Sequence, residues 1–163
     1  MPTTIVAGNW KMNTSIKEAT ELVFMIKTGL EAISGVEKVV CPPFVSLSSV
    51  KQVLNGTDIK LGAQNLHYEE KGAYTGEVSS AMLKDLCEYV ILGHSERRQH
   101  FGEDDLLINK KVATSLNARL RPILCVGERL EDREEGRAEE TVASQILNDL
   151  QGITSPNSLV LAY

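Results

Sequence analysis

Polar side chains that could act on a small substrate stand directly after three apolar runs of the sequence. They are Asn9 and Lys11 after the first run, Gln64 and Asn65 after the third, and His94, Ser95 and Glu96 after the fourth. A lysine ammonium is a compact cation suited to a phosphate or a developing enolate oxygen. An asparagine amide can donate to a substrate oxygen. A solvated loop lysine and a local turn bond to the backbone are the ordinary alternatives for these two residue types.

His94 lies in the stretch GHSERR, in which Ser95 is expected to cap a helix and Glu96 to lie in its first turn. A helix N-terminus disfavours the imidazolium, so a histidine there tends to be neutral and to donate a hydrogen bond without carrying charge. A satisfied structural histidine is the alternative. The loop-like surroundings of His67 and His100 favour that alternative for both.

Six short apolar or β-branched runs must position these side chains. They cover residues 4–7, 38–41, 59–62, 89–92, 122–126 and 159–162. Between them, apolar residues recur at helical spacing over 16–33, 108–116 and 142–150. This alternation predicts a parallel sheet with right-handed crossovers, either open and doubly wound or closed into a β/α barrel, with function at the carboxyl ends of the strands. No G-x-G-x-x-G follows the first run, so the barrel is favoured.

Composition limits the classes of protein to which this chain can belong. The 163 residues carry a net charge of −5, which fits one domain over 1–163 and argues against nucleic acid or an anionic membrane as a partner. No apolar stretch is long enough to span a membrane and no signal peptide is apparent, so we expect a cytoplasmic protein. Cys41, Cys87 and Cys125 form no C-x-x-C pair and are read as reduced packing residues, without a zinc site.

Two polar stretches stand out between the apolar runs. The charged run from Glu128 to Glu140 is read as a solvated helix face. The stretch from Gln64 to Glu77 is long, polar and glycine-containing, and it follows the third predicted strand. A loop in that place could project to bind a ligand or a partner subunit.

Four motifs together strongly resemble the triosephosphate isomerase family. They are AGNWKMN at 7–13, the Gln64-Asn65 pair with AYTGE at 73–77, ILGHSERR at 91–98 and CVGE at 125–128. The resemblance implies an α/β fold, the TIM (β/α)8 barrel. It also implies interconversion of dihydroxyacetone phosphate and glyceraldehyde 3-phosphate through an enediolate, with no metal and no organic cofactor. The neutral histidine of this family is a well-known case of pKa tuning.

The resemblance also implies roles for single residues. Asn9 and Lys11 would lie beside the substrate, and Lys11 would stabilise negative charge. His94 would be the neutral electrophile that polarises the carbonyl and helps to move the proton between oxygens. Glu96 would pair with Lys11 and orient the site. Cys125 resembles a buried position near the catalytic loops.

Residues 64–77 resemble the interdigitating loop of the family, whose tip around Thr75 would enter the neighbouring subunit. Glu77 and Arg98 would then form an intersubunit or loop-anchoring ion pair. We therefore expect a homo-oligomer that assembles through this loop.

The last run predicts a buried strand from Ser158 to Tyr163. In the family, the strand that ends in Ala-Tyr is followed by the catalytic glutamate and a lid loop, and strands seven and eight hold the phosphate. A barrel of this type has about 250 residues, so the sequence corresponds to an incomplete barrel of five βα units plus a sixth strand. Open edges on strands one and six predict self-association, recruitment of a complementary fragment or poor folding.

The family of this polypeptide and its activity are two separate predictions. Without the base and the phosphate loops, we expect weak or no binding of triose phosphate and negligible isomerase activity for the chain alone. The alternative is a non-catalytic scaffold that reuses the barrel units to self-assemble. Another phosphosugar barrel enzyme is a third possibility.

Overall fold

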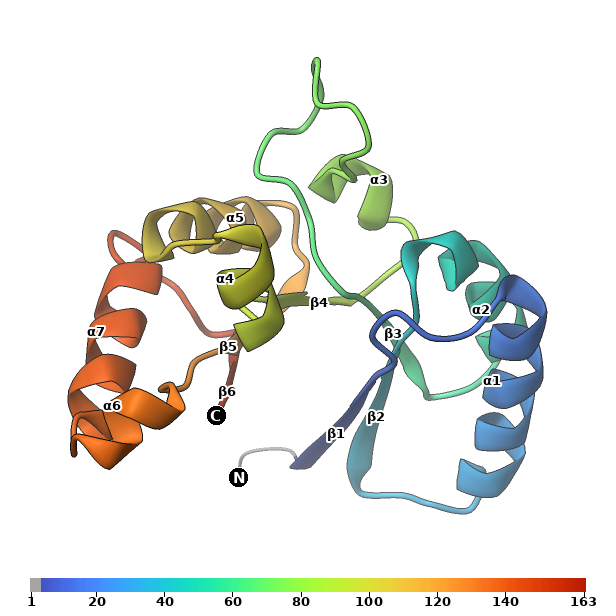
Figure 1. The fold of residues 1–163 in the computed structure, drawn as a ribbon. Coiled ribbons are helices and arrows are strands. Elements are labelled where there is room, and N and C mark those ends of the chain that lie inside the picture. The colour runs from blue at the N-terminus through green and yellow to red at the C-terminus, as the bar shows by residue number, and fades with distance from the viewer. Residues whose placement is uncertain (1–3) are drawn as a thin grey trace.

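The computed structural model describes residues 4–163 and contains one parallel sheet with the strand order β1-β2-β3-β4-β5-β6 (Figure 1). The strands are β1 (Thr4–Asn9), β2 (Val36–Cys41), β3 (Lys60–Ala63), β4 (Tyr89–Leu92), β5 (Arg121–Cys125) and β6 (Val160–Ala162). All neighbouring strands pair in parallel. Each predicted run is a strand, and the sheet is the open half-barrel that the sequence predicts.

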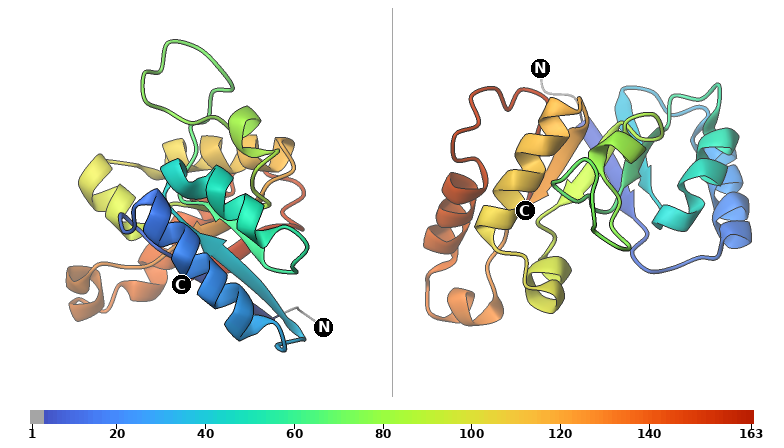
Figure 2. Two further views of the ribbon diagram at one scale, coloured as in Figure 1. Left: turned by 90° about the vertical axis from the view of Figure 1, so that its right-hand side faces the viewer. Right: turned by 90° about the horizontal axis from the view of Figure 1, so that it is seen from above.

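The helices cover the outer face of the half-barrel. They are α1 (Ile16–Leu30), α2 (Leu47–Leu54) with the short 3-10 turn η1 (Phe44–Ser46) before it, α3 (Ser80–Leu83), α4 (Ser95–Phe101), α5 (Asp105–Asn117), α6 (Leu130–Glu134) and α7 (Ala138–Asp149). Figures 1 and 2 show α1 and α2 beside the first strands, and α5 and α7 beside the last ones. None of the helices in residues 4–163 is long and apolar enough to cross a membrane.

Local sequence signals explain several helix boundaries. Ser15 and Glu18 form a capping box at the start of α1, in which each side chain accepts from the other residue's backbone N–H. The Asp104 side chain caps α5 by accepting from the backbone N–H of Leu107. The charged run 128–140 is not one helix face, because a turn with Gly136 at φ 74° separates α6 from α7.

Alternating strand residues build two layers of core. Residues such as Val40, Val90 and Leu124 pack outward against the helices. Val39 and Ile91 instead belong to a smaller cluster, which also contains Cys41, Tyr89 and Ile123 and shares no member with the first. The sheet therefore buries apolar side chains on both of its faces.

The three cysteines behave as packing residues. Cys41 and Cys87 are buried and Cys125 is partly buried, and none forms a disulfide. Burial raises the pKa of the Cys41 and Cys87 thiols to about 12. Both thiols are therefore protonated near neutral pH and poor nucleophiles.

The terminal strands leave the sheet with two free edges within one chain. β1 pairs with β2 and β6 pairs with β5, at opposite ends of the strand order. Val6 on β1 is 63% exposed and Leu161 on β6 is 47% exposed. No residue from Ser158 to Tyr163 is buried, and the strand itself is limited to Val160–Ala162. The prediction of a buried strand from Ser158 to Tyr163 is thus wrong in its burial and in its bounds, because no described element covers Leu161 or Tyr163.

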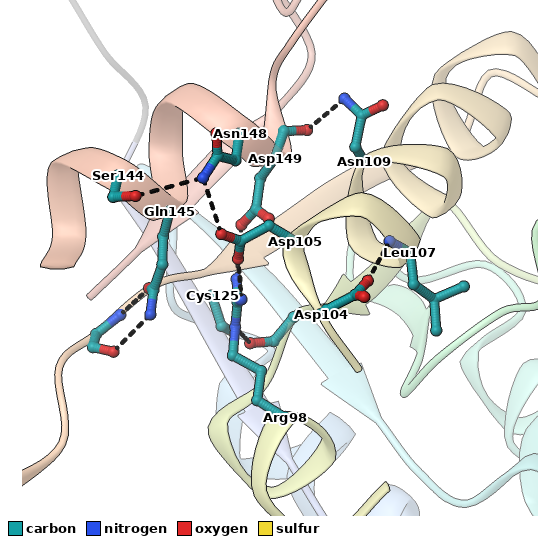
Figure 3. Close-up of polar contacts among 12 residues, drawn as sticks. Arg98, Asp104, Asp105, Leu107, Asn109, Cys125, Ser144, Gln145, Asn148 and Asp149 are labelled. Carbon is teal, nitrogen blue, oxygen red and sulfur yellow. Dashed lines mark hydrogen bonds and ion pairs between the residues drawn. The ribbon is translucent and has the colours of Figure 1, made fainter. Parts of the chain in front are cut away.

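A partly buried ionic cluster joins α4, α5 and α7 (Figure 3). Arg98 on α4 donates from Nη1 to Asp105 Oδ1 at 2.5 Å and from Nη2 to Asp149 Oδ2 at 2.6 Å. Asp149 is fully buried, and its second carboxylate oxygen has no hydrogen-bond partner in the described residues. Burial, with a smaller contribution from the Asp105 charge, raises the pKa of Asp149 to about 7 against the opposing effect of Arg98.

We expect this carboxyl to make the fold less stable as pH rises. From pH 3.8 to about 7 the folded state binds the Asp149 proton more tightly than the unfolded chain does, so the free energy of unfolding falls across that window. In the Asp149→Asn variant this decline, on the order of 2–4 kcal/mol, should disappear. Urea unfolding at a series of pH values measures it. The Asp58→Asn control should keep the decline, since Lys38 lowers the pKa of Asp58, and equal slopes for Asp149→Asn and wild type would contradict the expectation.

Candidate active site

The structure brings the loop after β1 to the start of α4. Lys11 Nζ donates to Glu96 Oε1 at 2.7 Å, although the two residues lie 85 positions apart in the sequence. Both side chains are about half exposed at the carboxyl ends of the strands, at 52% and 44%. Lys11, His94 and Glu96 therefore converge, as the strand-exit argument predicts.

The backbone of Lys11 is held in an unusual conformation. Its φ of 54° lies in the left-handed region, which side-chain-bearing residues rarely adopt. The Lys11 N–H donates to Asn9 Oδ1 at 3.0 Å, and the Lys11 carbonyl accepts from Gln64 Nε2 at 2.9 Å. Gln64 Nε2 also donates to the Cys41 carbonyl at 2.8 Å. These bonds fix the direction of the Lys11 side chain.

Two of these contacts refine the sequence interpretation. Asn9 makes a local turn bond, since its side-chain oxygen accepts from the Lys11 backbone. Its contact with substrate stays a prediction. Gln64 ties the Lys11 loop to the end of β2, a positioning role that sequence reasoning missed. Its place directly after the third strand was the only signal.

His94, not Ser95, is the N-cap of α4, so the predicted cap is wrong by one residue. His94 has the non-helical φ and ψ of −55° and 139°, and its Nδ1 accepts from the backbone N–H of Glu96 at 3.3 Å. A serine at the N-cap would accept this N–H with its side-chain oxygen, and here the ring nitrogen of His94 accepts it instead.

The cap bond also assigns the tautomer of the histidine. A backbone N–H can only donate, so Nδ1 of His94 is an acceptor and the proton of the neutral ring is on Nε2. Glu96 Oε2 lies 3.4 Å from Nδ1. The two atoms share no hydrogen bond in this state, because an unprotonated ring nitrogen and an ionised carboxylate oxygen are both acceptors. A neutral imidazole in this tautomer presents an Nε2–H donor, which can polarise a carbonyl.

The two carboxylates near the site are held by cations. The hydrogen bond from Lys11 is the largest cause that lowers the pKa of Glu96. Glu128 follows β5 and accepts from Arg133 and from the Tyr163 hydroxyl, at 2.7 and 3.1 Å. Hydrogen bonds from its own backbone and from Arg133 lower the pKa of Glu128. Both groups are therefore ionised and weakened as bases.

A cavity of about 450 Å³ opens beside His94 at the ends of β5 and β6. Its lining includes His94, Cys125, Glu128 and Tyr163. Gln145 holds one wall, because its side-chain amide accepts from the Gly127 N–H at 2.9 Å and donates to the Gly127 carbonyl at 3.1 Å (Figure 3). The cavity provides room for a small substrate on the side of the imidazole.

Of the residues predicted for a subunit interface, Thr75 and Glu77 lie apart from this cavity, whereas Arg98 is part of its lining. Residues 64–77 form a loop that projects away from the sheet (Figure 1), and Thr75 and Glu77 are exposed on it. His67 stabilises the loop, since its ring stacks on Tyr68 and contacts Tyr74 at centroid distances of 4.5 and 4.4 Å. Within residues 4–163, Arg98 makes no ion pair with Glu77, because Asp105 and Asp149 occupy its guanidinium. The intersubunit form of that pair stays a prediction.

The chain is similar to known proteins over nearly its whole length. A family model described as triosephosphate isomerase matches residues 4–163. Triosephosphate isomerase of Dehalococcoides mccartyi is 54% identical over 159 residues, which cover 98% of this chain and 63% of that protein. The same enzyme of Alkaliphilus oremlandii is 52% identical over 162 residues, 98% of this chain and 65% of that protein.

A solved structure agrees with these matches. The crystal structure of triosephosphate isomerase from Bartonella henselae superposes with a TM-score of 0.93 at 34% identity, covering 99% of this chain and 68% of that one. The chain thus spans less than two thirds of the length of the two curated relatives, at 63% and 65%. These matches exclude a different phosphosugar barrel family. The chain belongs to the triosephosphate isomerase family.

Proposed function

We propose that this chain supplies the electrophilic part of a site that interconverts dihydroxyacetone phosphate and glyceraldehyde 3-phosphate. The observation that carries the proposal is the convergence of the Lys11 ammonium with His94 and Glu96 at one end of the sheet, with the His94 proton on Nε2. Family membership alone would not require these groups to lie together. Their geometry suits an enediolate intermediate.

The proposed roles follow from charge. Removing a proton from the carbon beside a carbonyl places negative charge on the oxygen, and the Lys11 ammonium stabilises that charge. The Nε2–H of His94 donates to the same region and moves a proton between the two oxygens without becoming an isolated cation. Glu96 holds the Lys11 side chain in place at 2.7 Å. Asn9 fixes the Lys11 backbone and lies beside the substrate.

The reaction also needs a base for the carbon-bound proton. Glu96 and Glu128 are poor candidates, because their cationic and hydrogen-bonding partners lower the pKa of each carboxyl. The resemblance assigns the base to a glutamate directly after the Ala-Tyr of β6, beyond residue 163. We therefore propose that residues 1–163 alone have negligible activity and bind triose phosphate weakly.

A chimera tests the proposed function. Residues 1–163 are joined to the segment that the resemblance places after Tyr163, taken from the Dehalococcoides mccartyi relative. We expect the chimera to be an isomerase and its His94→Gln variant to lose about 10²- to 10⁴-fold in kcat. A matched His100→Gln variant, on the exposed end of α4, should keep full activity. A folded chimera without turnover, or equal rates for both variants, would contradict the proposal.

A non-catalytic, self-assembling role is the second candidate. The exposed apolar residues Val6 and Leu161 on the two edge strands favour it. Such a scaffold would have no use for the Lys11–Glu96 ion pair or the His94 tautomer. We also propose a cytoplasmic homo-oligomer that assembles through the projecting loop 64–77 and through the open edges.

A further inference from the structure

The short helix α4 carries His94 and Glu96 but has no apolar anchor. None of its residues from Ser95 to Phe101 is buried. A helix without a buried face gains little from packing, so polar contacts must decide where it lies. The position of the His94 ring therefore depends on the ion pairs of α4.

Arg98 makes three contacts from the middle of α4. Its Nε donates to the Gly93 carbonyl at 3.0 Å, while its two Nη atoms donate to Asp105 and Asp149 at 2.5 and 2.6 Å. Its side chain is only 14% exposed. The planar guanidinium thus holds three acceptors in one fixed arrangement, which a lysine cannot reproduce.

The Gly93 contact acts directly on the histidine backbone. Gly93 has a φ of 68°, and a Cβ at this position would lie 3.0 Å from the Cys125 carbonyl oxygen and 3.3 Å from Arg98 Nη2. The peptide between Gly93 and His94 therefore lies in close contact with the end of β5 on one side and with the Arg98 guanidinium on the other. A shift of Arg98 would rotate the peptide that directs the imidazole.

The two carboxylates are themselves fixed to larger helices (Figure 3). Asp105 begins α5 and accepts from Asn148 Nδ2 at 3.1 Å. Asp149 ends α7, is fully buried, and its carbonyl accepts from Asn109 Nδ2 at 3.0 Å. Because α5 packs against the core through Ile108 and Val112, the carboxylates form a rigid seat for Arg98.

We propose that Arg98, held between Asp105 and Asp149, is a residue that positions His94 by fixing the Gly93 peptide and the start of α4. The proposal rests on the proposed function only in that His94 is taken as the group that meets the substrate. Arg98 itself need not touch substrate, so it is a positioning residue. The raised pKa of Asp149 agrees with this seat, since one retained proton leaves the three charged groups nearly neutral.

The test observes the His94 ring rather than turnover. The ¹⁵N shifts of the imidazole report which nitrogen carries the proton, and amide exchange of Glu96 reports the cap bond. Both are measured in the 163-residue chain and in the chimera, with Arg98→Lys and Asp149→Asn. The matched control is Arg121→Lys, which breaks a comparable partly buried ion pair with Glu37 at 2.6 Å.

We expect His94 of the wild type to be protonated on Nε2 alone. In Arg98→Lys the two tautomers should mix and Glu96 amide exchange should quicken by about tenfold or more, with a smaller change in the same direction in Asp149→Asn. Arg121→Lys should leave both signals unchanged, even if it lowers the urea midpoint of unfolding as much as Arg98→Lys does. If Arg98→Lys does not fold, Asp149→Asn decides the question.

Unchanged His94 shifts and Glu96 exchange in the folded variants would overturn the proposal. So would equal changes in Arg121→Lys, since the effect would then be general destabilisation. Failure of the proposed function is distinguishable, because an inactive chimera can still show a His94 tautomer that depends on Arg98. An active chimera whose His94 signals ignore Arg98 would reject the positioning role alone.

Discussion

Residues 1–163 alone are expected to isomerise glyceraldehyde 3-phosphate at least about 10⁴-fold more slowly than the chimera. A positioned general base contributes about 10²- to 10⁴-fold, and the phosphate-binding loops supply binding energy that orients the reacting carbons. Neither contribution has a substitute among the described residues, since Glu96 and Glu128 are held by Lys11 and Arg133. Turnover of the purified chain and of the chimera in one coupled assay measures the ratio.

The control for this measurement is the His94→Asn variant of the 163-residue chain. Contaminating host isomerase gives the same trace rate in wild type and variant, so equal traces agree with an inactive chain. A rate that is present in wild type and lost in the variant would contradict the expectation. The replacement base would then have to be found within residues 1–163, beginning with Glu128, which lines the cavity beside His94.

The strands could be predicted well from the sequence because their signal is local. Tyr89–Leu92 is the fourth strand with the predicted boundaries, and all four of its residues are buried. A run of consecutive apolar residues is typical of a strand with both faces covered. The same rule failed at Leu161, which is 47% exposed, because an apolar run cannot say whether another element covers it.

The site could be predicted only in part, for a related reason. The convergence of Lys11, His94 and Glu96 could be predicted because the carboxyl ends of parallel strands meet at one edge of the sheet. The contact of Arg98 with Asp149 could not be predicted, since it joins residues 51 positions apart and no periodicity reports such a contact. The intersubunit role of Arg98 stays a prediction. The ion pair occupies the guanidinium that the resemblance had given to Glu77.

The cap of α4 shows a limit of residue preferences. Serine is favoured at N-caps, so Ser95 was the natural choice beside a histidine. The structure uses Nδ1 of His94 for the same bond, and this choice also fixes the tautomer that the proposed chemistry needs. His94 thus has both a structural role and a proposed catalytic role, which the sequence alone offered as alternatives.

In the chimera, Lys11→Met is expected to lower kcat/KM by about 10²- to 10³-fold. Methionine keeps much of the apolar stem but removes the ammonium that stabilises charge on the enediolate oxygen. Most of the loss should fall on kcat, since the charge develops only as the reaction proceeds. Steady-state kinetics in both directions of the isomerisation measure it. Lys17→Met is the matched control, because Lys17 is 85% exposed on α1 and lies 3.9 Å from Glu21.

Glu96 provides a second check on the role of Lys11. If Glu96 acts by holding the ammonium at 2.7 Å, Glu96→Gln should cost less than Lys11→Met, and the double variant should be no slower than Lys11→Met alone. Additive losses would mean that Glu96 contacts the reacting atoms by itself. A change of less than about threefold in Lys11→Met would remove Lys11 from the chemistry and reduce its ion pair with Glu96 to a contact that shapes the loop.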